Sequence, residues 1–91
     1  LVAHLDALLR TAEVPDYPGA VNGLQLENAG QVARVAAAVD WSRAAVEGAV
    51  AAGADLLLVH HGMFWGGAQP LVGPAYAKLR ACLAGNVAVY A

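Results

Sequence analysis

The feature that most constrains the fold is an almost wholly apolar run, Leu56 to Val59, which is followed directly by two histidines. A short apolar run of this kind is typical of a strand that is covered on both faces in a parallel sheet. A second run of small residues and valine, Val32 to Val39, comes before it, and residues 43–52 between the two have helical spacing. The sequence therefore predicts a β-α-β unit whose two strands are parallel.

Two more helices and two more strands are predicted on either side of this unit. Helical spacing covers residues 1–12 and 74–84, and strand patterns cover residues 21–27 and 87–90. A proline- and glycine-rich segment, residues 14–19, predicts a loop after the first helix. Together these elements predict an α/β fold, a three-layer, mostly parallel sheet with helices on both faces.

The same spacing predicts which helix positions face the core of the protein. In the helix of residues 43–52, Ser42 is placed as the N-cap. The expected inward positions are Val46, Ala49 and Val50 in this helix, and Tyr76, Leu79, Cys82 and Leu83 in the helix of residues 74–84. Cys82, the single cysteine, is thus expected to be a small buried hydrophobe.

The composition predicts that much of the surface is covered by something else. Charged residues make up 13 % of the chain, against about 25 % in an ordinary globular protein. The chain also begins without Met and stops at a strand pattern, Asn86 to Ala91. We therefore expect residues 1–91 to be one portion of a single α/β domain, the amino-terminal part of a larger protein, and its apolar surface to be buried by missing sequence or by neighbouring subunits.

Several functional classes are disfavoured by charge and hydropathy. The net charge is −2, and no basic run is present, so nucleic acid is an unlikely partner. No apolar run approaches the roughly 20 residues that span a bilayer, so no membrane role is expected. One cysteine excludes an internal disulfide and favours a cytoplasmic location.

Three side chains that suit metal chemistry are expected at one edge of the sheet. His60 and His61 follow the Leu56–Val59 strand, and Asp40 follows the strand before it. Ligand sites in open α/β sheets gather at the carboxyl ends of strands, so these groups are expected to converge. Neighbouring residues of a strand point to opposite faces, which suits two nearby ions with one imidazole each better than one shared ion.

Four stretches of the chain resemble the Nif-three-like dinuclear metal-centre family, also known as GTP cyclohydrolase 1 type 2 homologs. The specific one is Ala54-Asp-Leu-Leu-Leu-Val-His-His-Gly-Met-Phe-Trp65, although Gly62 stands where many members have proline. The supporting ones are Val21-Asn-Gly-Leu-Gln-Leu26, Val35-Ala-Ala-Ala-Val-Asp-Trp-Ser42 and Asn86-Val-Ala-Val-Tyr-Ala91. Their order and spacing are similar to the family's over almost the whole chain.

The resemblance implies two divalent metal ions per subunit of the full-length protein, held by His60, His61 and later ligands that lie outside these residues. The ions could be Zn, Fe, Mn, Co or Ni. It also implies a homohexamer and a hydrolase that opens the guanine ring of a nucleotide, GTP, with release of formate. The alternative is a non-catalytic metal-binding regulator or assembly protein. No catalytic residue is identified.

Other residues near these motifs have two interpretations each. Asp40 either accepts a hydrogen bond that orients a metal-binding imidazole or caps the next helix beside Ser42. Asn22 and Gln25 either line the site or turn the backbone. Phe64 and Trp65 either wall the pocket or anchor the loop, and anchoring is favoured. Tyr17 and Trp41 could stack a base but are expected to pack, and His4 is expected on the surface.

Overall fold

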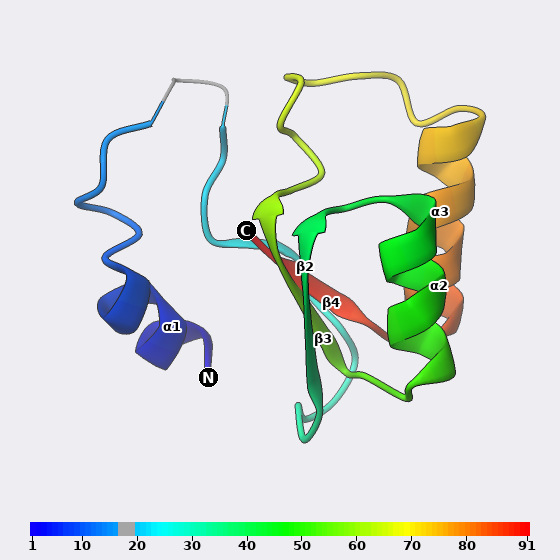
Figure 1. Ribbon diagram of the computed structural model, residues 1–91, viewed down its shortest axis with the longest axis horizontal. Helices are drawn as coiled ribbons and strands as arrows, with labels where there is room; N and C mark the ends of the chain where they lie inside the picture. The colour runs from blue at the N-terminus through cyan, green and yellow to red at the C-terminus, as the bar shows by residue number, and fades with distance from the viewer. Residues whose placement is uncertain (17–19) are drawn as a thin grey trace.

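The computed structural model describes residues 1–16 and 20–91, whose centre is a four-stranded sheet. The strands, in chain order, are β1 (Leu24–Leu26), β2 (Val35–Asp40), β3 (Leu56–His61) and β4 (Ala88–Tyr90). They lie side by side in the order β1-β4-β3-β2 (Figure 1). Two of the three pairings, β2 with β3 and β3 with β4, are parallel, and the short β1 joins β4 antiparallel. The expected mostly parallel sheet is confirmed.

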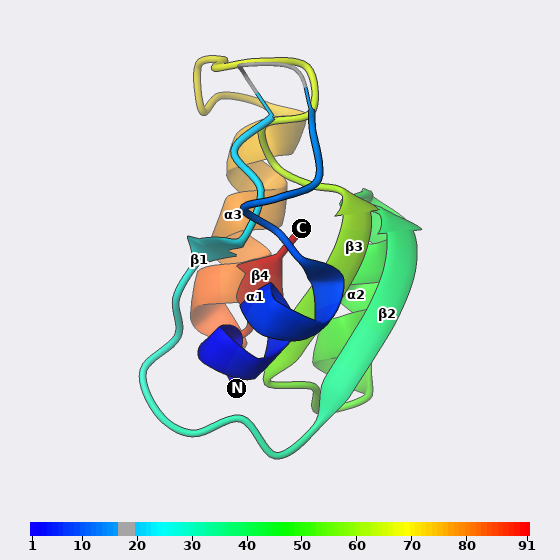
Figure 2. The same cartoon turned by 90° about the vertical axis from the view of Figure 1, so that its left-hand side faces the viewer.

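Helices cover both faces of this sheet, which gives the expected three layers. The helices are α1 (Val2–Leu9), α2 (Arg43–Ala51) and α3 (Pro74–Ala84). Helices α2 and α3 lie together on one face and α1 lies on the other, as two perpendicular views show (Figures 1 and 2). No helix within residues 1–16 and 20–91 is both long enough and apolar enough to cross a membrane.

The β-α-β unit forms for the local reasons that the sequence suggested. Ser42 Oγ accepts a hydrogen bond from the Ala45 N–H at 3.1 Å and so caps α2. After this helix, Gly53 adopts a φ of +70°, a left-handed conformation that other residues rarely take. Asp55 then accepts hydrogen bonds from the backbone N–H groups of Ala33 and Arg34, at 2.9 and 3.0 Å, which joins the start of β3 to the start of β2.

The main core lies between the sheet and the α2–α3 pair. It contains Val46, Ala49, Leu57, Cys82 and Val89, each at most 2 % exposed. Burial raises the pKa of the Cys82 thiol, so this cysteine is the buried hydrophobe that was expected. A smaller cluster on the other face holds Leu56, Ala88 and Tyr90 against Val2 and Leu5 of α1.

Some of the expected inward positions are wrong. Val50 is 40 % exposed, and Tyr76 and Leu83 are 52 % and 60 % exposed. Each helix buries only a narrow stripe of its surface, which holds Val46 and Ala49 in α2 and Cys82 in α3. Helix α1 is also shorter than expected, because Arg10 takes a left-handed conformation (φ 52°, ψ 46°) that ends it after Leu9.

Candidate metal centre

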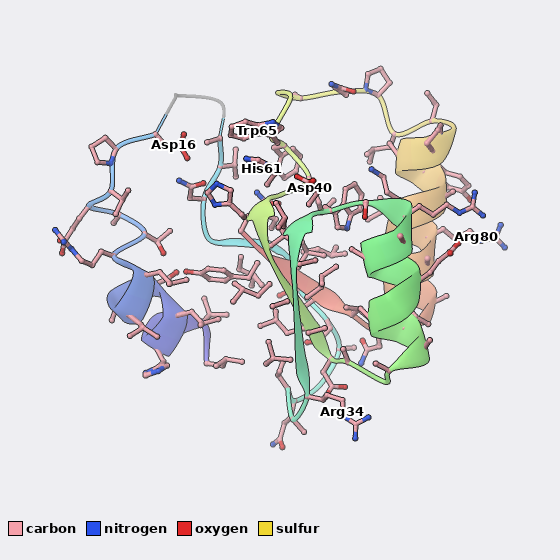
Figure 3. All side chains as sticks on the ribbon, viewed as in Figure 1. Asp16, Arg34, Asp40, His61, Trp65 and Arg80 are labelled. Carbon is pink, nitrogen blue, oxygen red and sulfur yellow. The ribbon has the colours of Figure 1, made fainter. Side chains whose placement is uncertain are left out.

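The pairing of β2 with β3 brings Asp40 and His61 together. Asp40 lies opposite His61 in the parallel register, and the Trp41 N–H donates to the His61 carbonyl at 3.0 Å. The two side chains lie at the carboxyl end of both strands, with Trp65 above them (Figure 3). The expected convergence of Asp40 with a histidine is confirmed.

The His61 imidazole is held in one orientation by two neighbours. Its Nδ1 lies 2.7 Å from Asp40 Oδ1, and its ring stacks on Trp65 with 4.0 Å between centroids. A carboxylate offers only lone pairs, so Nδ1–H is the donor, and in the neutral tautomer the lone pair of Nε2 is available. Metal-binding histidines are oriented in this way by a carboxylate on their other nitrogen. Two roles were considered for Asp40, and its contact with His61 is the one expected of a carboxylate that orients a metal-binding imidazole. Ser42 is the residue that caps α2.

The strand runs further than the sequence suggested, and this directs the two imidazoles toward different faces of the sheet. We expected it to end at Val59, but β3 continues through His61, since regular pairing with β2 reaches that far. His60 and His61 therefore point toward different faces of the sheet. Their ring centroids are nonetheless 4.5 Å apart, with 45° between the ring planes.

Each histidine lines a hollow of its own. His61 lines a hollow of about 250 Å³ with Asp40 and Trp65, beside α3. His60 is exposed and lines a hollow of about 430 Å³ on the α1 side, with Asp16 and Asn22. The Asn22 side-chain amide donates to Asp16 Oδ2 at 3.0 Å, so Asn22 belongs to the surroundings of His60.

Gln25 holds the loop that follows the histidines. Its Oε1 accepts from the Met63 N–H and its Nε2 donates to the Val21 carbonyl, both at 2.7 Å. Gly62 packs so closely here that a Cβ on it would collide with the Gln25 side-chain amide and lie 2.6 Å from Ala91 Cβ. The contacts of Gln25 are therefore structural: they hold the backbone immediately after His61.

The two tryptophans near His61 have different surroundings: one lines the smaller hollow and the other lies in the main core. Trp65 is 51 % exposed, stacks on His61 and lines the smaller hollow, so it forms part of the wall of this hollow. Trp41 is 7 % exposed and belongs to the main core, as expected for packing. His4 is exposed on α1, as expected. Tyr17 lies outside the described residues.

The residues present fit a divalent metal ion, although they do not complete a site. Imidazole nitrogens suit Zn, Fe, Co and Ni, and the Asp40–His61 hydrogen bond leaves one such nitrogen open. Within residues 1–16 and 20–91, no group of three or more His, Cys, Asp or Glu side chains is placed to hold a metal ion. Further ligands would have to come from elsewhere.

One residue of the site was missed by the sequence analysis. Lys78 Nζ donates to the Trp41 carbonyl at 3.1 Å and lies 4.4 Å from the centroid of the Trp41 ring, and Lys78 lines the smaller hollow. Its helix position between Tyr76 and Leu79 gave no motif. Only the tertiary contact of α3 with Trp41, which follows β2, brings it there.

Comparison with known proteins places the chain in a family. The model of the family Duf34/NIF3 (NGG1p interacting factor 3) matches residues 1–91. The chain is 41 % identical to a protein of Deinococcus radiodurans named GTP cyclohydrolase 1 type 2 homolog, over all of this chain and 34 % of the relative. Its fold matches the crystal structure of a Thermus thermophilus protein, with a TM-score of 0.89 and 39 % identity over 98 % of this chain and 36 % of that one.

A further solved structure, titled protein ybgI of unknown function, has a TM-score of 0.86 and 36 % identity over 98 % of this chain and 36 % of that one. The chain thus spans about a third of the length of the relatives that it matches. The family match covers every residue of the chain. The chain therefore belongs to the Duf34/NIF3 family.

Proposed function

We propose that the intact protein binds two divalent metal ions through His60, His61 and ligands beyond these 91 residues, and uses them as a hydrolase. The observation that carries the proposal is the 2.7 Å hydrogen bond from His61 Nδ1–H to Asp40. It fixes the tautomer that a metal ligand needs, and the ring of a second histidine lies 4.5 Å away. The name of the Deinococcus relative supports a reaction of the GTP cyclohydrolase type, hydrolytic opening of the guanine ring with release of formate.

Each group of this chain has a part in that proposal. Two bound divalent ions supply Lewis acidity that lowers the pKa of water to about 7 and makes it a nucleophile. His60 and His61 offer one nitrogen each, on either side of the end of β3. Asp40 holds the Nδ1 proton of His61, and the Trp65 ring shields one face of that imidazole from solvent.

The test is an assay of the intact protein after metal removal and reloading with Zn, Fe, Mn, Co or Ni. We expect formate to be released from GTP with at least one metal, and His60→Ala and His61→Ala each to abolish the release. His4→Ala is the matched control, because His4 is exposed on α1 and far along the chain from the site. Two bound ions per subunit with no turnover of GTP or of phosphoesters would contradict the hydrolase.

A second candidate is a metal-binding regulator or assembly protein, in which the ions stabilise a homohexamer. Exposed large apolar side chains favour it, among them Val39 at 64 % and Leu83 at 60 % exposed, since such residues are commonly covered in assemblies. Under this candidate His60→Ala and His61→Ala change metal content or sedimentation only, and no reloaded metal gives turnover.

A further inference from the structure

Lys78 differs from Arg10 and Arg43 in its neighbours. Arg10 and Arg43 are exposed, and each pairs with a glutamate at 2.8 Å. Lys78 is half-buried, and its ammonium contacts a neutral carbonyl and a neutral indole ring, both of Trp41. Within the described residues no carboxylate lies within 4.0 Å of its nitrogen. Its charge is therefore not neutralised by an ion pair.

This ammonium lines the same hollow as His61. The only carboxylate among the described lining residues, Asp40, already accepts the His61 Nδ1–H at 2.7 Å. Other parts of the lining are aromatic side chains and backbone, among them Phe64, Trp65 and Gly66. The hollow is thus lined by an ammonium that forms no ion pair and by an imidazole whose Nδ1–H is already bound to the one lining carboxylate.

We propose that this hollow is an anion-binding subsite, in which Lys78 binds a phosphate or carboxylate group of the substrate. The proposal rests on the proposed function for its substrate, but the binding of an anion can be tested without it. A lysine ammonium is a compact charge with three donors, and the Trp41 carbonyl takes one of them. The other two are available to anionic oxygens, with which charged hydrogen bonds are strong.

The size of the hollow limits what it can hold. Pockets that enclose a whole small-molecule ligand measure roughly 300–1,000 Å³, and this one measures about 250 Å³. It therefore takes the charged group and the atoms next to it, while the rest of the substrate would extend past His61.

The alternative role for Lys78 is purely structural, a tie between α3 and Trp41. Lys78→Gln separates the two roles, because glutamine still carries an N–H donor but has no charge. Arg80→Gln is the matched control: Arg80 is exposed on the same helix and lies on its outer side, away from His61 (Figure 3), and the substitution removes the same charge.

The experiment is a titration of the chelator-treated intact protein with inorganic phosphate and with acetate, followed by tryptophan fluorescence. Trp41 and Trp65 both line the hollow, so occupancy should change their emission. We expect saturable binding of at least one anion at millimolar concentration, at least tenfold weaker in Lys78→Gln, restored in Lys78→Arg and unchanged in Arg80→Gln. Equal binding by Lys78→Gln and the wild type, or no saturable binding of either anion by the wild type, would overturn the subsite.

A second measurement ties the subsite to turnover. GTP and guanosine carry the same scissile ring and differ in the phosphates, so we expect the wild-type preference for GTP in kcat/KM to fall about tenfold in Lys78→Gln. An unchanged preference overturns the role of Lys78 in substrate binding. If neither GTP nor guanosine is turned over, the proposed hydrolase activity is wrong. The titration still decides whether the anion-binding subsite exists.

Discussion

The two faces of the sheet are covered very unevenly, and each carries one of the two histidines. Among residues 1–16 and 20–91, the α2–α3 face has nine buried residues in one cluster, whereas the α1 face has three, and α1 itself has none. His61 belongs to the well-packed face and is held by Asp40 and Trp65. His60 belongs to the thinly covered face, and its imidazole forms no hydrogen bond within the described residues, although its ring contacts that of His61. Residues of this chain therefore orient the His61 imidazole, whereas no hydrogen bond of the described residues orients the His60 imidazole.

The largest expected difference between the faces is in stability. Leu57, on the α2–α3 face, is 1 % exposed, so Leu57→Ala should lower the free energy of unfolding by about 2–5 kcal/mol through lost burial and a cavity. Leu5, on α1, is half-buried, and Leu5→Ala should lower it by less than about 1.5 kcal/mol. Urea denaturation of the two variants measures both values. Equal losses would mean that the faces are covered alike.

The next effect concerns how His61 is held. Asp40→Asn keeps the shape of the side chain but weakens its hydrogen bond, and we expect a 10–100-fold loss of metal affinity, about 1.4–2.7 kcal/mol. Ser42→Ala is the control, since it removes the cap of α2 and should lower stability by about 1 kcal/mol without changing metal affinity. Calorimetric titration with the metal distinguishes the two. The orienting role of Asp40 is wrong if both variants bind like the wild type.

A smaller effect is expected where Gln25 holds the loop after His61. Gln25→Ala leaves the partly buried Met63 N–H without its acceptor, which should destabilise the protein by about 1–2 kcal/mol. Hydrogen exchange at the Met63 amide should become faster, and thermal unfolding should occur at a lower temperature. Gln31→Ala, at an exposed position, serves as the comparison and should change neither. Unaltered exchange in Gln25→Ala would show that the loop is held by other contacts.

The smallest effect is expected at Tyr90, whose hydroxyl joins α1 to the sheet through a hydrogen bond to Asp6. The Tyr90 hydroxyl donates to Asp6 Oδ1 at 2.5 Å and lies 2.7 Å from Thr11 Oγ1, so Tyr90→Phe should lower stability by about 0.5–1.5 kcal/mol. Burial, and then the hydrogen bond to Asp6, raises the pKa of Tyr90 above its ordinary value of 10.0.

The sign of the pH dependence follows from this raised pKa. The folded state binds the phenolic proton more tightly than the unfolded state, so the contribution of Tyr90 is complete below about pH 10 and is lost as the pH rises through the folded value. Chemical denaturation across alkaline pH should show a steeper loss in the wild type than in Tyr90→Phe. Tyr76→Phe, at a position 52 % exposed, should follow the wild type, and a wild-type slope in Tyr90→Phe would exclude this contact as the cause.

The sequence predicted those parts of the molecule that depend on local pattern. Periodicity and strand-end rules predicted three features that the structure has. They are the strand that leads to His60, the Ser42 cap of α2, and the position of Asp40 beside a histidine at the edge of the sheet. The reach of β3 through His61 was not predicted, because histidine carries no strand signal and only pairing with Asp40 extends it. Lys78 was missed for a similar reason, since its role depends on tertiary packing against Trp41.

The most direct test of the central claim is the metal content of the intact protein, measured by elemental analysis after loading. We expect two divalent ions per subunit in the wild type, retention of both in His4→Ala, and loss of at least one in His60→Ala and in His61→Ala. A wild type that holds no transition metal, or histidine variants that hold as much as the wild type, would contradict the claim.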